Sequence, residues 1–334
     1  MTDVLRQWQL TDFGHHNLRL AELPLPQPGP GQILVRVEAA SLNYRDLMLV
    51  ENRYGWTPPL PFVPASDLAG TVAAVGVGVT RWKGGERVIS TFFAGWTDGA
   101  MPAGTYSLGG PGPGALASHV LLDQDWAVGA PAHLSAVQAS TLPCAGLTAW
   151  SSLVTEGQAK AGQTVLIHGT GGVALFGLQV ALLHGVQAIV VSGDADKRDK
   201  ALALGAAHVI ARDADWPAEV LRLTGGRGVD HVLETVGGAN LGRSLKALAQ
   251  GGKVGVIGVL DGLELSAAFP DLIRTHGRIL GIGVGSRAGL EELVRAADAS
   301  RLAPVIAAEY DAKEVRAAFE HLARGPFGKL VVRF

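Results

Sequence analysis

The glycine-rich segment 164–181, TVLIHGTGGVALFGLQVA, has residue types and a spacing that suit phosphate binding. An apolar run, a glycine cluster and a second apolar run predict a strand, a turn and a helix in the G-x-G-x-x-A pattern. Gly169 permits a tight turn, and Gly171 permits a pyrophosphate to approach the backbone. Gly172 and Val173 begin the helix and offer unpaired N–H groups to an anion. The alternative is a plain strand–turn–helix connection that binds nothing.

The residues after the next predicted strand indicate which dinucleotide would fit. Ser192, in VVSGDADK, stands where an acid would bind the hydroxyls of the adenosine ribose. A serine followed by a glycine leaves room for a 2′-phosphate, and Lys197 and Arg198 in the next predicted helix would be balanced by such an anion. We therefore expect NADP. NAD is the alternative because Asp194 is close by, although Asp194 also suits an N-cap beside these two cations.

The chain from residue 126 to 274 contains alternating apolar strands and helical segments, which predicts a doubly wound parallel sheet, the Rossmann fold. Within it, a helix is expected over 240–249 and the next strand over KVGVIGV. Val236, Val259 and Val284 fall just beyond predicted strand ends, where ligands of such sheets bind. We expect these valines to give backbone contacts and an apolar wall, with ordinary core positions as the alternative.

The first 125 residues have a different sequence pattern, in which short β-branched segments alternate with turns rich in glycine and proline. This spacing predicts a small barrel or sandwich. Residues 94–114 are dense in glycine and proline and predict a long loop, a type of segment that often has a function. After about residue 275, strand and helix patterns mix again.

Composition excludes several classes of protein. The chain has 334 residues, of which 48% are hydrophobic and 17% charged, with a net charge of −2, so a globular protein of two domains is expected. Nothing in this balance favours nucleic acid or a membrane surface as a partner. One cysteine, Cys144, excludes an intramolecular disulfide. The N-terminal residues do not predict a signal peptide, so we expect a cytoplasmic protein.

The chain resembles the medium-chain dehydrogenase/reductase superfamily over essentially its whole length. The segments that carry the resemblance are ILVRVEAASLNYRDL, VPASDLAGTVAAVGVGVTRWKGGERV, LPCAGLTAW, GTGGVALFGLQVA, ALALGAAHVI, VLETVGG, GGKVGVIGV, GVGSR and FGKLVV. The resemblance implies a GroES-like β-barrel over 1–125, completed by 275–334, and a Rossmann domain over 126–274. It also implies a small-molecule substrate between the domains. The strand RILGIGVG could pair across a two-fold axis, so a homodimer is expected.

The zinc ligands of the family's alcohol dehydrogenases are mostly missing. The resemblance places Asn43 at the first ligand, a cysteine in those enzymes, and Ser66 and Asp67 at a His-Glu pair. The third ligand position falls on Cys144. A catalytic zinc needs three strong ligands, and residues 94–114 contain none of the four cysteines of the structural zinc lobe. We therefore expect no zinc and interpret Cys144 as a buried small residue.

The resemblance also implies roles for three further residues. Asn43 would lie beside the nicotinamide and the substrate, and its amide would hold the coenzyme ribose or donate to the substrate oxygen; a turn cap is the alternative. Tyr54 would line the substrate cleft, unless it is a packed aromatic of a surface loop. Thr148 would contact the nicotinamide carboxamide, unless it bonds to its own helix backbone. Arg45 and Asp46 are interpreted as a local structural pair.

The chain is thus most similar to the zinc-independent branch of quinone oxidoreductases and enone reductases. Hydride addition to a quinone or an α,β-unsaturated carbonyl gives a delocalised anion that hydrogen bonds can stabilise without a Lewis acid. The first hypothesis is an NADPH-dependent reductase of such compounds. The second is a zinc-independent alcohol dehydrogenase acting on alcohols and aldehydes, and the third is a coenzyme-binding protein without turnover.

Overall fold

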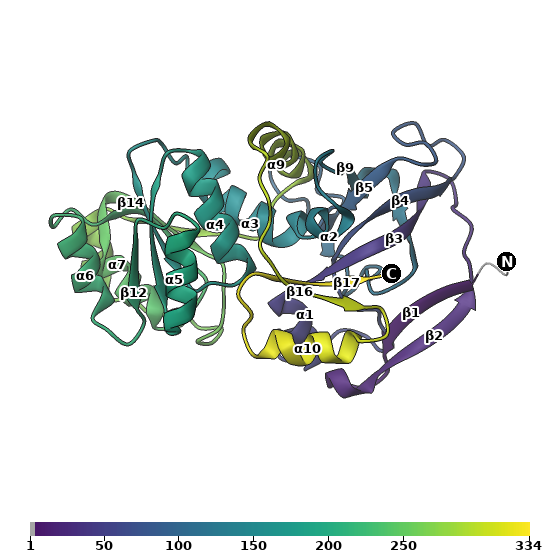
Figure 1. Ribbon diagram of the computed structural model, residues 1–334, viewed down its shortest axis with the longest axis horizontal. Coiled ribbons are helices and arrows are strands. Elements are labelled where there is room, and N and C mark those ends of the chain that lie inside the picture. The colour runs from purple at the N-terminus through teal and green to yellow at the C-terminus, as the bar shows by residue number, and fades with distance from the viewer. Residues whose placement is uncertain (1–3) are drawn as a thin grey trace. The chain divides into compact units, whose positions relative to one another are not determined.

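The computed structural model describes residues 4–334 and contains two compact units (Figure 1). The first unit is formed by the chain up to residue 147 and by 285–334, and the second by 148–284. The borders predicted from the sequence lie at 126 and 275. The segment from 126 to 147 belongs to the first unit because β9 (Ala127–Gly129) pairs with β5 (Arg87–Ser90). The helix α2 (Ala136–Ala139) contacts β3 (Gln32–Leu42) in the same unit.

The first unit is built on a sheet with the strand order β16–β17–β3–β4–β5–β9, in which β8 also pairs with β3. Its remaining strands are β4 (Asp67–Val75), β8 (His119–Asp123), β16 (Ile306–Asp311) and β17 (Lys329–Arg333). The pair β16–β17 is parallel and the other pairs are antiparallel. The last strand of the chain therefore pairs with β3, and it brings Leu330 opposite Leu42.

Further strands and helices complete the first unit. They are the hairpin β1 (Val4–Leu10) and β2 (Leu18–Pro24), the pair β6 (Phe93–Ala94) and β7 (Tyr106–Ser107), and the helices α1 (Tyr44–Val50), α9 (Arg287–Ser300) and α10 (Val315–Ala323). The predicted loop 94–114 is thus partly ordered, because β6 and β7 pair across it.

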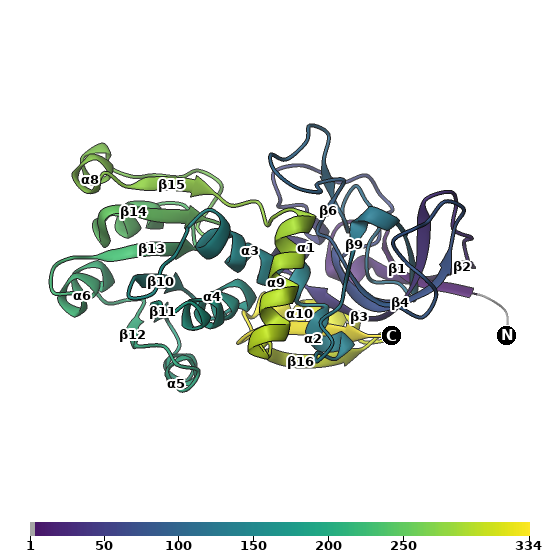
Figure 2. The ribbon, with the colours of Figure 1, turned by 90° about the horizontal axis from the view of Figure 1, so that it is seen from above.

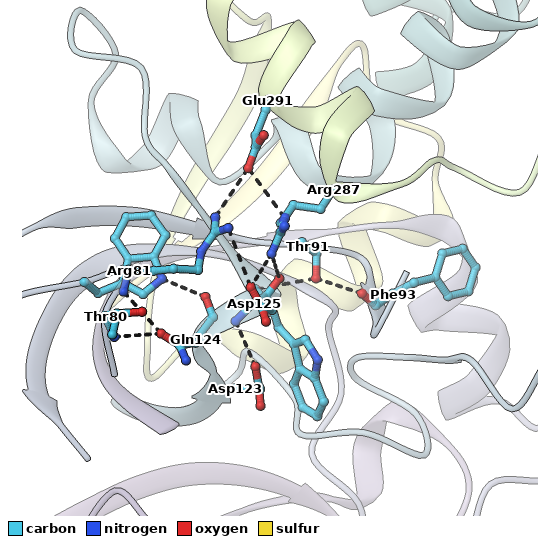
Figure 3. A network of polar contacts seen from close by, with 11 residues as sticks. Thr80, Arg81, Thr91, Phe93, Asp123, Gln124, Asp125, Arg287 and Glu291 are labelled. Carbon is cyan, nitrogen blue, oxygen red and sulfur yellow. Dashed lines mark hydrogen bonds and ion pairs between the residues drawn. The ribbon is translucent and has the colours of Figure 1, made fainter. Parts of the chain in front are cut away.

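A cluster of ion pairs fixes the start of α9 to the barrel (Figure 3). Arg287 pairs with Asp125 and lies 3.5 Å from Glu291, while Arg81 lies 3.6 Å from Asp125 and 3.3 Å from Glu291. The backbone N–H of Arg287 also donates to the carbonyl of Trp96 over 2.9 Å. Partly exposed pairs of this kind contribute about 0–1 kcal/mol each. Their combined effect is to join three distant segments where the chain re-enters the barrel.

The second unit is a six-stranded parallel sheet in the order β12–β11–β10–β13–β14–β15, which Figure 2 shows side by side. The strands are β10 (Thr164–His168), β11 (Gln187–Ser192), β12 (His208–Ala211), β13 (Val229–Glu234), β14 (Leu248–Val256) and β15 (Arg278–Gly281). The prediction of a doubly wound parallel sheet is confirmed. The strand order reverses between β10 and β13, and this is the place where open α/β sheets bind ligands.

Helix α3 (Leu147–Trp150) precedes the first of these strands, and the other helices connect them. The connecting helices are α4 (Gly172–Leu183), α5 (Ala195–Ala203), α6 (Trp216–Leu223), α7 (Asn240–Lys246) and α8 (Phe269–Thr275). The helix predicted over 240–249 ends at Lys246, because Leu248 already pairs with Val229 and a register shift follows. Within residues 4–334, none of the helices has the length and apolar character needed to cross a bilayer.

Candidate functional site

The glycine turn lies between β10 and α4. Gly169 has φ 81°, which only glycine adopts without strain, and its N–H donates to the carbonyl of Val191 over 2.8 Å. Gly171 is the N-cap of α4 with an ordinary φ of −78°. A Cβ added to Gly171 would meet no atom within 4 Å, so the space beside this backbone is open. Gly172 begins α4 and Val173 follows it, so their N–H groups lie in its first turn.

The ends of β10 and β13 are joined at the same edge of the sheet. The hydroxyl of Thr235 donates to the carbonyl of His168 over 2.7 Å. The buried carboxylate of Glu234 accepts hydrogen bonds from the backbone N–H groups of Val236 (2.9 Å) and Gly237 (3.1 Å). The carboxylate of Glu234, the last residue of β13, therefore fixes the turn that contains Val236.

Glu234 also binds side chains of the following helix. It accepts from Asn240 Nδ2 over 2.9 Å and from Ser244 Oγ over 2.5 Å, and His168 Nε2 lies 3.6 Å away. Burial lowers the pKa of His168, more than the neighbouring carboxylate raises it. Sequence reasoning gave Glu234 no role, although Glu234 lies in the quoted segment VLETVGG and the spacing Glu–x5–Asn–x3–Ser is visible over residues 234–244.

The two remaining valines of the predicted set lie in turns beyond β14 and β15. The turn with Val259 is tied to Val236, whose carbonyl accepts from the N–H of Asp261 over 2.9 Å. Val284 is nearly buried and has φ 57°, a conformation that costs a β-branched residue about 1–3 kcal/mol. Such strain is typical of residues whose backbone is aimed at a ligand.

Two guanidinium groups surround the end of β11. Arg198 Nη1 donates to the carbonyl of Ser192 over 2.9 Å. The backbone N–H of Arg212 donates to the same carbonyl over 3.2 Å. The guanidinium of Arg212 lies against Gly193, where an added Cβ would meet Nη2 at 3.1 Å. Asp194 is the N-cap of α5, and its carboxylate accepts from the N–H of Lys197 over 3.0 Å. Arg212 was not predicted, because it follows β12 and reaches Gly193 only through the fold.

Thr148 lies in the second unit and is buried. It belongs to α3, which has a π-helical turn on each side, Leu142–Gly146 and Ser151–Thr155. Single π-turns inside helices are frequent at functional sites.

The first unit contains a buried polar cluster around Asn43. Lys329 Nζ donates to Asn43 Oδ1 over 2.5 Å and to the carbonyl of Leu42 over 2.6 Å. Asn43 Nδ2 donates to Ser66 Oγ over 3.4 Å, and the amide also hydrogen-bonds to Asp67. Lys329 and Asp67 are both buried, and each has its pKa shifted by burial toward its neutral form. Lys329 lies in the quoted segment FGKLVV, but sequence reasoning gave it no role.

Arg45 and Asp46 form the other half of this cluster. Their side chains are buried and lie 3.2 Å apart, and Asp46 Oδ2 accepts from the N–H of Asn43 over 2.8 Å. Asn43 is thus also the N-cap of α1, the role kept as its alternative. Arg45 Nη2 donates to Ser107 Oγ over 2.9 Å, and its guanidinium lies 5.7 Å from the ring centre of Tyr54. Tyr54 is therefore half-buried against this cluster.

Two family models match the chain. Residues 29–132 match the alcohol dehydrogenase GroES-like domain, and residues 172–325 match the zinc-binding dehydrogenase. The chain belongs to the medium-chain dehydrogenase/reductase superfamily. Its first unit is the GroES-like barrel and its second the Rossmann domain, as the sequence predicts. The protein is accordingly an oxidoreductase of a pyridine-nucleotide-dependent family.

Three similar proteins illustrate this membership. A zinc-type alcohol dehydrogenase-like protein of Schizosaccharomyces pombe is 35% identical over 96% of both chains. The quinone oxidoreductase of Rattus norvegicus is 28% identical over 98% of both chains. A crystal structure of a Sinorhizobium meliloti 1021 protein described as an alcohol dehydrogenase is 50% identical, with a TM-score of 0.96 over 100% of both chains.

The zinc in the description of the matching family does not fit the residues present. Asn43 Oδ1 is bound to Lys329, and Ser66 Oγ donates to Asp67 over 2.6 Å. Burial, reinforced by the charge of Asp67, raises the pKa of the Cys144 thiol and keeps it protonated. Across residues 4–334, no three His, Cys, Asp or Glu side chains are grouped as a metal ion requires. One protonated thiol beside an amide and a hydroxyl is not a zinc ligand set.

We expect the cluster to make stability depend on pH through Asp46. Burial raises the pKa of Asp46 from 3.8 to about 6, against the lowering effect of Arg45. The pKa of Asp46 is higher in the folded protein than in the unfolded chain, so protonation of Asp46 stabilises the fold. This stabilisation is complete below pH 3.8, the unfolded pKa, and is lost as pH rises through about 6, the folded pKa. Between about pH 8 and about pH 5, wild type should gain about 1 kcal/mol relative to D46N, measured as unfolding free energies. A difference that stays constant over this range would contradict the raised pKa.

Proposed function

We propose that this protein is an NADPH-dependent, zinc-independent oxidoreductase that reduces quinones or α,β-unsaturated carbonyls. The observation that carries the proposal is the replacement of the metal ligands by a hydrogen-bonded cluster of Asn43, Ser66, Asp67 and Lys329. Hydrogen-bond donors alone can stabilise the delocalised anion that forms when a quinone or an α,β-unsaturated carbonyl is reduced, whereas an alkoxide is stabilised better by a Lewis acid.

The glycine turn fits the pyrophosphate of a dinucleotide. The open space beside Gly171 and the first turn of α4 provide close approach and N–H donors. When bound, the coenzyme supplies the hydride. Val236, Val259 and Val284 would face its nicotinamide end with backbone groups and methyl groups, and Thr148 would bind the carboxamide.

A preference for NADPH over NADH is supported by the end of β11. Arg198 and Arg212 place two cations around Ser192 and Gly193, with Lys197 beside them on α5. Asp194 is the acid that could bind a ribose diol, but its carboxylate is engaged as the N-cap of α5. A 2′-phosphate would find cationic donors here, whereas an unphosphorylated ribose would share the Asp194 carboxylate with the N–H of Lys197.

On the substrate side, we assign the polar contacts to Asn43 and Tyr54. Asn43 would hold the coenzyme ribose or donate to the substrate oxygen, and Tyr54 would donate a hydrogen bond or a proton. Both residues are linked through Arg45 and Asp46, which fixes their surroundings.

The proposal is tested by one substrate screen. Purified protein is assayed with NADPH and with NADH against a 1,4-quinone, a cyclic enone and an aldehyde, and with NADP⁺ against primary and secondary alcohols, each with and without a chelator. Turnover of the quinone or the enone, unaffected by the chelator, supports the proposal. Turnover restricted to alcohols and aldehydes would favour the second candidate, a zinc-independent alcohol dehydrogenase, which the name of the 50% identical protein supports. Coenzyme binding without oxidation would indicate a binding protein.

We also propose a cytoplasmic homodimer formed through β15. This strand lies at the edge of the sheet, and large apolar side chains are exposed nearby: Leu263, Leu265, Phe269, Ile273 and Ile279. An exposed edge with apolar neighbours is a template for pairing with a second copy. Phe269→Asp should convert the dimer to a monomer in sedimentation analysis, whereas Val77→Asp, at a highly exposed apolar position in the other unit, should not. A monomeric wild type would refute this assembly.

A further inference from the structure

Lys329 is buried in the interior of the barrel unit. It is the first residue of β17 and is 4% exposed. Its ammonium group donates to the carbonyl of Leu42 and to Asn43 Oδ1. Burial of an ammonium group is unfavourable unless such bonds compensate for it, and replacement of buried charges by apolar residues is often neutral or stabilising. Stability alone therefore does not explain a lysine at this position.

The lysine determines which way the Asn43 amide is turned. An ammonium group has three donors and no acceptor, so the amide atom that faces it must be Oδ1. The amide nitrogen is thereby placed on the opposite side, toward Ser66 and Asp67. Ser66 Oγ gives its proton to Asp67 Oδ1 and so presents lone pairs to the Asn43 N–H. Every partner in the cluster is consistent with one orientation of the amide.

We propose that Lys329 is a positioning residue that holds the Asn43 side chain in one orientation and so fixes the direction of its N–H donors. The role rests on the proposed function, in which Asn43 is the polar contact for the coenzyme ribose or the substrate oxygen. Since Lys329 also binds the Leu42 carbonyl, it fixes the backbone that carries Asn43 as well as the side chain.

Steady-state kinetics separates this role from a purely structural one. Lys329→Met removes the donors and keeps an apolar stem of similar length. We expect kcat to fall at least about tenfold. The dissociation constant for NADPH should rise by a similar factor if the Asn43 amide holds the coenzyme ribose, and should change by less than about threefold if it donates to the substrate oxygen. Lys329→Arg, which can still donate to Oδ1, should recover part of kcat. An unchanged kcat per folded enzyme in Lys329→Met would overturn the proposal.

Lys253 provides a matched control. Its ammonium group also donates to two backbone carbonyls, those of Glu156 (3.2 Å) and Gly157 (2.7 Å), in the other unit. Lys253→Met should lower the unfolding temperature without lowering kcat. If both lysine variants lower kcat equally, the effect on Lys329 is general destabilisation and the proposal fails.

A spectroscopic test does not depend on turnover. The chain has four asparagines, at 17, 43, 52 and 240, so selective ¹⁵N labelling gives four side-chain amide pairs, and an Asn43→Ser sample assigns one of them. In Lys329→Met the Asn43 pair should shift or split while the other three stay in place. Lys329→Gln serves where Lys329→Met does not fold, because a glutamine permits both amide orientations. An unmoved Asn43 signal overturns the proposal even where wild type reduces nothing in the screen, which would by itself reject only the proposed function.

Discussion

Replacement of Gly171 by valine is expected to weaken NADPH binding at least about 100-fold and to leave the fold intact. The reason is local. Gly171 has φ −78° and ψ −173°, which valine adopts readily, and an added Cβ would contact no protein atom within 4 Å. The valine side chain would therefore occupy the space that the proposed pyrophosphate needs. The measurement is a fluorescence titration of the variant with NADPH.

A second glycine serves as the control for this prediction. Gly129, in β9 of the barrel unit, also has open space around an added Cβ. Gly129→Val should therefore bind NADPH like wild type. Gly171→Val should lose only about 1 kcal/mol of stability, from the poorer N-cap, which corresponds to a few degrees in unfolding temperature. Unchanged NADPH affinity in Gly171→Val would mean that the dinucleotide does not bind at this turn.

The features that could be predicted from the sequence are those set by neighbouring residues. The turn at Gly169 depends on a conformation that a glycine alone permits, and the parallel sheet depends on apolar runs between helices. The N-cap role of Asp194 likewise follows from its place before α5. In each case the residues that decide the structure lie within one turn or one strand of each other.

The features that were missed depend on contacts between distant segments. Lys329 and Asn43 are separated by 286 positions and meet because β17 pairs with β3. Arg212 reaches Gly193 because β12 lies beside β11. The segment from 126 to 147 lies in the first unit for the same reason, since β9 pairs with β5 of that unit. No local pattern encodes these pairings, so sequence reasoning identified the family positions but not their partners.

Replacement of Ser192 by aspartate is expected to reverse the coenzyme preference. Ser192 is buried at the carboxyl end of β11, beside Arg198 and Arg212. A carboxylate there would repel a 2′-phosphate and would accept hydrogen bonds from the hydroxyls of an unphosphorylated ribose. We expect kcat/KM with NADPH to fall at least about 100-fold, equivalent to about 2.7 kcal/mol, and kcat/KM with NADH to rise.

Two companion variants show which group acts on the phosphate. Ser192→Ala removes one hydroxyl and should lower kcat/KM with NADPH only a few-fold, because the Ser192 hydroxyl makes one long contact, 3.4 Å from the N–H of Asp194. Arg212→Leu removes a cation and should weaken NADPH much more than NADH, since only NADPH carries the anion that a guanidinium binds. If kcat/KM fell equally with NADPH and with NADH, both in Ser192→Asp and in Arg212→Leu, the 2′-phosphate would have to bind elsewhere. The residues at the end of β11 would then have only a structural role, in which Arg212 packs against Gly193.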